Sequence, residues 1–283
     1  MKTRWSLLLW PPFALCLLLL VGTQSVFLSA GFFKDLGLGL LSPQLTLANY
    51  VTVLTDPFYL RSLGLTFYLS AIVVVLTLIC AYPVAYVIAR MQSRWAMWLL
   101  AGIVVSSFIT VVIKVLGLVI IFGANGPVNA FLQSTGLVEE RVSIVGNVYG
   151  VVIGLMHYVI GFMVLMLFSV VQTIPRSLEE AARIHGASRL RVFWRVVLPL
   201  SMPGVIAGSL IVFNLCMGAL VSAVLLGGGR VLTLPVLIQR SIVLNLEYAM
   251  GSALAAVLLV SVLFINIVSV VLLRRLRITR LAT

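Results

Sequence analysis

The chain has 283 residues, of which 62% are hydrophobic and 9% charged, and its mean hydropathy is +1.22. Soluble domains carry about 25% charged residues, so this composition excludes a water-soluble globular protein. The formal net charge of +12 does not indicate nucleic-acid binding, because no polar basic domain is present to carry the cations.

Apolar stretches set the predicted architecture, since a membrane-spanning helix needs about 20 mostly apolar residues. They predict an all-α polytopic membrane protein in a single membrane domain over 1–283, with six spans at about 11–33, 62–89, 95–122, 144–173, 203–226 and 248–273. Transmembrane strands are excluded, because the runs do not alternate with period two.

The first span follows Lys2 and Arg4, and Ser29-Ala30-Gly31 after it has the composition of a signal-peptidase site. A cleaved signal and a retained helix are therefore both open. We expect a retained helix, because the apolar run exceeds the usual signal core of about 7–15 residues.

Two connections on the predicted outer side carry local signals. In 34–61, apolar residues recur at a spacing that predicts a short amphipathic helix at the membrane interface; they are Leu45, Leu47, Tyr50, Val51 and Leu54. The segment 123–143 opens with Gly123-Ala124-Asn125-Gly126-Pro127, which predicts a turn.

The charges of the connections predict the orientation of the chain. With the N-terminus inside, the inner segments hold 13 cations and only two acids, Glu179 and Glu180. The outer segments are balanced, with Lys34, Arg61, Arg141, Arg230 and Arg240 against Asp35, Asp56, Glu139, Glu140 and Glu247. The positive-inside rule then predicts a membrane protein with an even number of crossings and both termini in the cytoplasm.

The predicted cytoplasmic segment 174–203 is polar but patterned. Ser177 with Glu180 three residues later has the spacing of a capping box, and Gly186 supplies a helix stop. A second helix is predicted from near Ser188 through Phe193 and Trp194, two expected interface anchors, to Leu198-Pro199. The segment should therefore form a short helix, a glycine turn and an amphipathic helix that re-enters the membrane.

The same segment carries a motif of fixed spacing. Glu180-Ala181-Ala182 is followed by Gly186, then by Val196 and Leu198-Pro199. This pattern resembles the EAA signature of ABC importer permeases, which reads E-A-A, three residues, G, nine residues, I, one residue, L-P. Val196 in place of isoleucine is the one departure.

The resemblance implies a type I ABC importer permease fold in the bacterial inner membrane. In that fold the first helix of the loop is a coupling helix that docks on an ABC ATPase dimer. The residues it assigns to coupling are Glu179, Glu180, Ala181, Ala182, Arg183, Gly186, Leu198 and Pro199. Charge pairs of Glu179, Arg183 and Arg189 across that interface are also expected. The alternative is an ordinary basic loop held near anionic lipid, which would explain the arginines but not the spacing of the motif.

The chain is not expected to be an enzyme. A phosphate-binding loop requires Gly-Lys-Ser/Thr, and the three lysines, Lys2, Lys34 and Lys114, follow Met1, Phe33 and Ile113. We therefore expect no cofactor or metal on this chain, with ATP and Mg²⁺ held by the partner ATPase.

Softer signals resemble the spermidine/putrescine-type first permease of a two-permease system. They are Asp56-Pro57, Tyr82-Pro83-Val84-Ala85-Tyr86, Gly123-x-Asn125-Gly126-x-x-Asn129 and Leu225-Leu226-Gly227-Gly228-Gly229-Arg230. The resemblance implies a heterodimer with a second permease and a soluble solute-binding protein. However, Ser106-Ser107-Phe108 and Lys114-Val115-Leu116 replace the aromatic and arginine segments of that group, which leaves the cargo open.

Four polar residues are candidates for a translocation path: Lys114, Asn214, Glu247 and Asn266. An ammonium group inside a span usually faces protein or a water-filled cavity, and it suits an anionic or zwitterionic cargo. Alternatively, Lys114 snorkels or pairs with Glu247, the asparagines join helices, and Glu247 marks the interface. His157 is expected to be a packing residue.

A different class of protein remains as the alternative, namely an ion-driven secondary transporter or channel that acts without an ATPase. Such proteins place acidic pairs or broken helices near the bilayer midplane. Here every acid lies in or beside a predicted loop, which favours the importer permease.

Overall fold

The computed structural model describes residues 3–136 and 144–281, with side chains described for 10–136 and 144–271. Within these residues, six helices are long and apolar enough to cross a membrane, which confirms the predicted fold class. They occupy Trp10–Phe32, Pro57–Arg90, Val111–Ser134, Val148–Thr173, Arg189–Met217 and Tyr248–Val271. Arg141, Glu139 and Glu140 lie outside the described residues.

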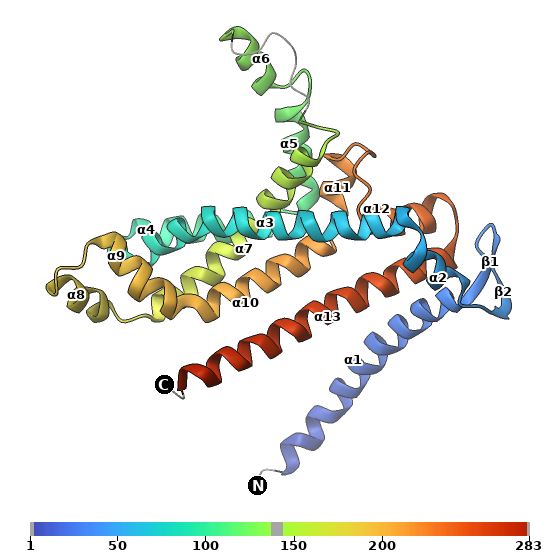
Figure 1. Ribbon diagram of the computed structural model, residues 1–283, viewed down its shortest axis with the longest axis horizontal. Helices are drawn as coiled ribbons and strands as arrows, with labels where there is room; N and C mark the ends of the chain where they lie inside the picture. Colours follow the sequence, from blue (N-terminus) through green and yellow to red (C-terminus); the bar gives the residue numbers. More distant parts are fainter. Residues whose placement is uncertain (1–2, 137–143, 282–283) are drawn as a thin grey trace. The chain divides into compact units, whose positions relative to one another are not determined.

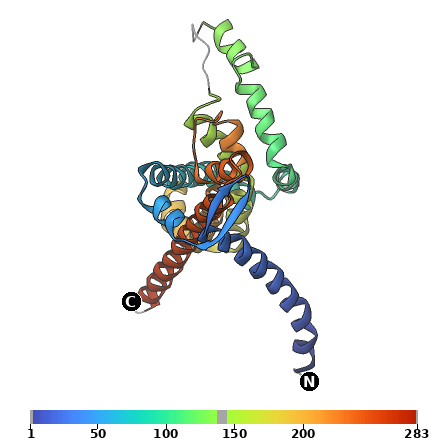
Figure 2. The same cartoon turned by 90° about the vertical axis from the view of Figure 1, so that its right-hand side faces the viewer.

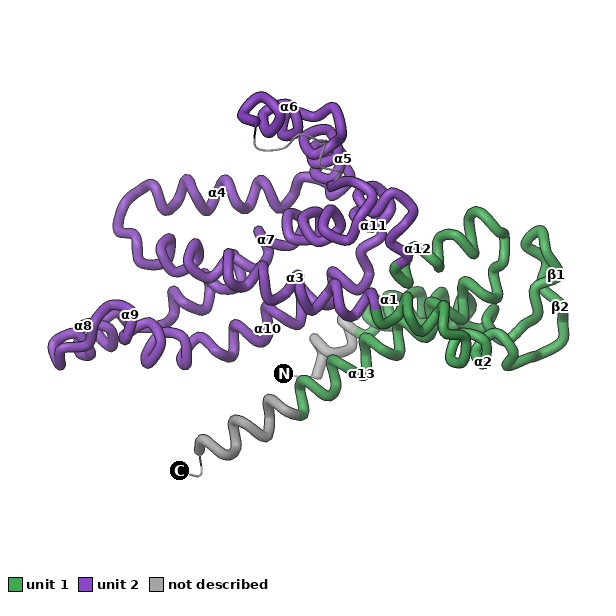
Figure 3. Tube along the Cα trace, turned by 45° about the horizontal axis from the view of Figure 1, so that its top comes forward, with its two compact units in different colours: residues 1–64, 233–283 green, residues 65–232 purple. Residues whose placement is uncertain are grey.

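The chain divides into two compact units, residues 1–64 with 233–283 and residues 65–232 (Figure 3). Unit 1 contains α1 (Thr3–Ser29), η1 (Ala30–Phe32), β1 (Phe33–Gly37), β2 (Leu40–Leu45), α2 (Ala48–Thr55), the start of α3 (Pro57–Arg90), α12 (Leu234–Gln239), the π-helical η3 (Arg240–Leu244) and α13 (Tyr248–Leu281). The rest of α3 belongs to unit 2.

Unit 2 continues with α4 (Trp95–Phe108), α5 (Val111–Phe122), α6 (Pro127–Ser134), α7 (Val148–Thr173), α8 (Arg176–Ile184), α9 (Arg189–Val192), the π-helical η2 (Phe193–Val197), α10 (Leu198–Met217) and α11 (Val221–Leu225). Within this unit α7 packs against both α4 and α10 (Figure 1). The core of unit 2 includes Met163, Leu167 and Val212, each at most 1% exposed.

Small residues allow the helices of unit 2 to approach closely. A Cβ atom at Gly154 would collide with Leu226, and one at Gly204 of α10 would collide with Val170 of α7. Without the hydrophobic effect to hold helices together in lipid, such close van der Waals packing is a main source of their association.

The prediction of one helix over 95–122 was wrong. α4 ends at Phe108 and α5 begins at Val111, with extended backbone at Ile109 and Thr110. Ser107 Oγ bonds back to the carbonyl oxygen of Ile103 at 2.8 Å, and the Ile109 N–H bonds to Ser106 rather than to the carbonyl four residues back. Hydroxyl groups that compete for backbone partners weaken a helix at this point.

The fifth span also differs from the prediction of 203–226. The helix begins earlier, at Arg189, and α10 ends at Met217. A break at Gly218 and Ala219 then leads to the short helix α11. The apolar composition of Val221–Leu225 hid this break, because composition reports burial in lipid or protein and not helix continuity.

Unit 1 contains an antiparallel hairpin that the sequence analysis missed. Strands β1 and β2 pair Phe33 with Leu45, and the turn between them has positive φ at Gly37, Leu38 and Gly39 (Figure 2). The Asn49 side chain of α2 donates to the backbone carbonyl of Phe33 at 2.8 Å and so fixes the base of the hairpin. The predicted amphipathic helix is present as α2, just after the hairpin.

The hairpin caps the last long helix. The two carboxylate oxygens of Asp35 accept hydrogen bonds from the N–H groups of Ala249 and Met250, each at 3.1 Å. These N–H groups belong to the first turn of α13 and have no partner within the helix, and the helix dipole favours a negative charge there.

We expect Asp35→Ala to lower the free energy of unfolding by about 1 kcal/mol, the usual cost of removing a helix cap. Thermal unfolding of the purified chain in detergent measures this change. Asp35→Asn is the matched control, because an asparagine side chain still accepts a hydrogen bond and should retain most of the stability. Equal losses in both variants would contradict the capping role.

Candidate functional site

The segment 174–203 folds into the predicted helix, turn and helix, but its first helix begins differently. α8 starts at Arg176 after Pro175, which supplies no side-chain cap, so the predicted capping box of Ser177 and Glu180 is wrong. The residue before a proline is held in an extended conformation, as Ile174 is here, and this places the start of the helix directly after Pro175.

The end of α8 confirms the role predicted for Gly186. Its φ is +82°, and the Gly186 N–H bonds to the carbonyl of Arg183 at 2.9 Å. The Ala187 N–H bonds to the carbonyl of Ala182 at 3.1 Å, so the two bonds form a Schellman motif. Glycine tolerates this positive φ without the strain that a side chain would add.

The second helix begins where predicted and runs without interruption into the membrane-length helix. Ser188 Oγ accepts from the Arg191 N–H at 3.4 Å at the start of α9. The π-helical turn η2 then leads into α10, where Leu198 and Pro199 occupy the first two positions. Proline has no N–H to donate, and the wider turn before it accommodates that loss within a continuous helix.

The two faces of α8 differ in exposure. Glu180, Ala181, Arg183 and Gly186 are exposed, and Ile184, which the sequence analysis did not single out, is 84% exposed. Glu179 and Ala182 are half-buried on the opposite face. α8 therefore presents a small surface of mixed charge and apolar character, which we call the α8 outer face and define as Glu180, Ala181, Arg183 and Ile184.

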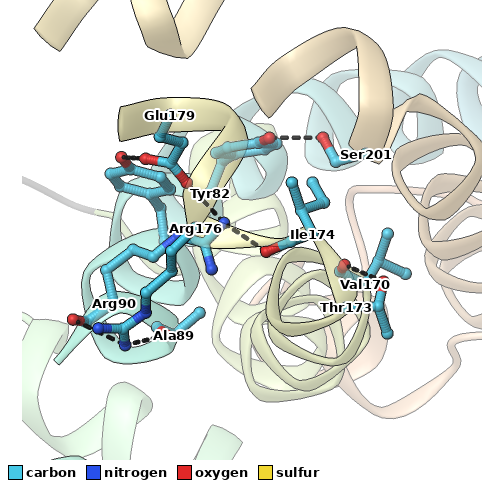
Figure 4. Close-up of polar contacts among 10 residues, drawn as sticks. Tyr82, Ala89, Arg90, Val170, Thr173, Ile174, Arg176, Glu179 and Ser201 are labelled. Atoms are coloured by element: carbon cyan, nitrogen blue, oxygen red, sulfur yellow. Dashed lines mark hydrogen bonds and ion pairs between the residues drawn. The ribbon is translucent and has the colours of Figure 1, made fainter. Parts of the chain in front are cut away.

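Glu179 joins α8 to the end of α3. Its carboxylate lies 2.6 Å from the Arg90 guanidinium and accepts a hydrogen bond from the Tyr86 hydroxyl at 2.8 Å (Figure 4). The side chains of Arg90 and Glu179 are 15% and 13% exposed. Glu179 is therefore bound within its own chain, and a charge pair of Glu179 across an interface stays a prediction.

Two further bonds join the same elements. Arg90 donates to the backbone carbonyl of Ile174 at 3.2 Å, and Arg176 donates to the carbonyl of Arg90 at 3.2 Å (Figure 4). Arg90 thus binds the carbonyl that follows the last residue of α7. Arg176 binds the carbonyl of the last residue of α3. We call Tyr86, Arg90, Arg176 and Glu179 the α3–α8 junction. Because it combines an ion pair with bonds to backbone, it holds α8 at a fixed position on α3.

Side-chain contacts extend the junction to η2 and α10. The Phe193 ring packs edge-on against Tyr82 and Tyr86, with ring centroids 5.1 and 5.8 Å apart, and its role as an interface anchor stays a prediction. The Tyr82 hydroxyl and the Ser201 hydroxyl of α10 are 2.5 Å apart (Figure 4). Trp194, by contrast, is 58% exposed.

A hollow of about 330 Å³ lies beside the junction. Its lining includes four cations and two acids, namely Arg90, Arg176, Arg183, Arg189, Glu179 and Glu180. Arg90, Tyr82 and Tyr86 were not predicted to be site residues. The available signal was their spacing, because positions four apart on a helix share one face.

The four path candidates lie in two different units. In unit 2, Lys114 is buried on α5 and Asn214 is half-buried on α10. In unit 1, Asn266 bonds to the carbonyl of Val262 in its own helix at 2.8 Å, and Glu247 accepts from Asn245 at 3.4 Å. A shared path for the four residues, and a pair between Lys114 and Glu247, stay predictions.

Among the described residues, six membrane-length helices, with the exposed helix α8 between the fourth and the fifth, define a polytopic membrane protein. A family model described as "Binding-protein-dependent transport system inner membrane component" matches residues 81–278. The chain belongs to this family of ABC importer permeases, which are multi-pass inner-membrane transport subunits and not enzymes.

Relatives and solved structures agree with this assignment. The chain is 32% identical over 211 residues to the spermidine/putrescine transport system permease protein PotB of Haemophilus influenzae, which covers 75% of this chain and 73% of that protein. It is 33% identical to PotB of Escherichia coli, over 74% of this chain and 75% of that protein.

Two solved transporters share the fold. A bacterial ABC transporter involved in the import of the acidic polysaccharide alginate matches with a TM-score of 0.76 and 21% identity, over 95% of this chain and 96% of that one. The MetNI methionine ABC transporter matches with a TM-score of 0.59 and 18% identity, over 78% of this chain and 98% of that one.

Proposed function

We propose that this chain moves a small solute inward by alternating access and that a separate ABC ATPase dimer drives it by docking on the α8 outer face. The observation that carries the proposal is the construction of α8. It is exposed on one face, closed by a Schellman motif at Gly186, and bound on its other face to α3 through Arg90 and Glu179. A force applied to such a helix reaches a membrane span directly.

The chemistry of the α8 outer face suits a protein groove. Ala181 is small enough for close approach. Ile184 is an apolar side chain whose exposure to water is unfavourable and which a partner could cover. Glu180 and Arg183 at its edges suit charge pairs, which add more to specificity than to affinity. ATP and Mg²⁺ would bind to the ATPase, because this chain has no phosphate-binding loop.

The proposed assembly has a second permease chain and a soluble solute-binding protein on the outer side. Family membership supports the binding protein, and a structural relative was solved as an alginate transporter in complex with an alginate pentasaccharide-bound periplasmic protein. The excess of inner cations supports an orientation with both termini and α8 in the cytoplasm. The PotB relatives support a polyamine-like or another small organic cargo.

Reconstitution in liposomes tests the proposal. The chain, its second permease and its ATPase are inserted together, and the binding protein with labelled solute is added outside. We expect uptake only when ATP is enclosed with the ATPase on the α8 side. Uptake by the chain alone, driven by an ion gradient without the ATPase, would instead establish a secondary transporter.

A further inference from the structure

Lys114 is a buried cation in unit 2 whose ammonium group has no partner there. The residue lies on α5 and is 9% exposed. Across the described residues of unit 2, it forms no hydrogen bond or ion pair through its side chain. It lines a cavity of about 420 Å³ between α3, α4, α5 and α7, together with His157, Ser106, Trp98 and apolar residues such as Ile103 and Ile160.

The cavity is lined by hydrogen-bond donors that favour a bound anion, and no aspartate or glutamate is among its lining residues. Of the acids described in unit 2, Glu179 and Glu180 both lie on α8, and Glu179 is bound by Arg90. Lys114 donates only, and the imidazole of His157 and the hydroxyl of Ser106 add further donors. An ammonium group inside a membrane span usually faces protein or a water-filled cavity, and an anion that entered this cavity would meet donors only.

The helix break adds positive potential one turn before Lys114. α5 begins at Val111, one turn before Lys114, and Thr110 supplies no side-chain cap to its free N–H groups. A helix N-terminus carries a partial positive charge. Broken membrane helices direct such ends at the anionic groups of their substrates in other transporters.

We propose that this cavity binds a carboxylate of the cargo and that Lys114 is its principal ligand. His157 and Ser106 are further ligands of the same group. The inference rests on the proposed transport function and deepens it. It predicts a cargo that differs from the spermidine and putrescine in the names of the PotB relatives. A bare polyamine carries only positive charge, which the ammonium group of Lys114 would repel.

Three compounds of equal chain length test the proposal. Putrescine carries two ammonium groups, 4-aminobutanoate one ammonium and one carboxylate, and succinate two carboxylates. ATP-dependent uptake of each is measured in liposomes with the full complex, at concentrations that saturate the binding protein. We expect at least one of the two acids to be taken up at least tenfold faster than putrescine, about the discrimination that one charged hydrogen bond provides.

The variants identify the ligand. Lys114→Gln should slow uptake of the preferred acid by about 10- to 100-fold, and Lys114→Arg should retain most of it. Ser106→Ala, at an exposed position where folding is not at risk, should slow it several-fold. Lys34→Gln makes the same chemical change at an exposed lysine of β1 and should leave the selectivity unchanged.

Several results would overturn the assignment: uptake of putrescine as fast as the acids, uptake of neither acid, or wild-type selectivity in both Lys114→Gln and Ser106→Ala. Failure of the proposed function is seen separately. Uptake of an acid that does not require the ATPase would refute the ATP-driven mechanism while leaving the anion site in place.

Discussion

Gly186→Pro is expected to abolish the stimulation of ATPase activity by solute and binding protein in the assembled complex. Proline fixes φ near about −65°, whereas Gly186 has φ of +82°. The substitution also removes the N–H that bonds to the carbonyl of Arg183. The Schellman motif cannot form, so α8 loses its defined end and its position relative to α9. The measurement compares ATP hydrolysis with and without loaded binding protein.

Two controls isolate the effect of the turn. Gly186→Asn should retain most of the stimulation, because asparagine tolerates positive φ better than other residues with a side chain, and no atom lies within 4 Å of the added Cβ. Gly136→Pro makes the same change at another exposed glycine of positive φ, at the end of α6, and should retain full stimulation. Full stimulation in Gly186→Pro would refute the role of α8 in coupling.

Glu179→Gln is expected to lower the free energy of unfolding by about 3 kcal/mol, the usual cost of leaving one charge of a buried pair without its partner. Arg90 would keep its bond to the carbonyl of Ile174 and a neutral hydrogen bond to the new amide oxygen, but it would lose its ionic partner. Because the junction also positions α8, we expect stimulated ATPase activity to fall in the same variant. Denaturant unfolding of the purified chain measures the stability change.

The neighbouring glutamate provides a matched control. Glu180 is exposed on the α8 outer face, so Glu180→Gln should change the stability by less than about 0.5 kcal/mol. The double variant Arg90→Leu/Glu179→Leu should recover much of the stability, since an apolar pair leaves no unpaired charge. Equal losses in Glu179→Gln and Glu180→Gln would contradict the structural role of the ion pair.

The membrane architecture could be predicted because the bilayer imposes it. Each span requires about 20 apolar residues, and the number of membrane-length helices follows directly from that requirement. The breaks at Ile109–Thr110 and at Gly218 could not be predicted, because apolar composition continues through both. Their positions depend on hydroxyl bonds and helix contacts that only the folded chain defines.

The coupling helix could be predicted from local signals, but its attachment could not. Gly186 and Ser188 act within a few residues of their own positions, so their roles are readable in the sequence. The ion pair of Arg90 with Glu179 joins positions 89 residues apart (179 − 90). In the sequence alone, Glu179 cannot be distinguished from Glu180 as a surface charge. Its pairing with Arg90 of the same chain could therefore not be predicted.

Site-directed cross-linking measures the contact between α8 and the ATPase most directly. Cys16, Cys80 and Cys216 are replaced by alanine, and a single cysteine is placed at Ile184, the most exposed apolar position of the α8 outer face, or at exposed Thr135 near the end of α6 as a control. A short thiol-to-amine cross-linker is then applied to the assembled complex in membranes. We predict a covalent product of Ile184→Cys with the ATPase and none from Thr135→Cys. A product from Thr135→Cys alone would place the motor on the opposite side of the membrane from α8 and would contradict the account.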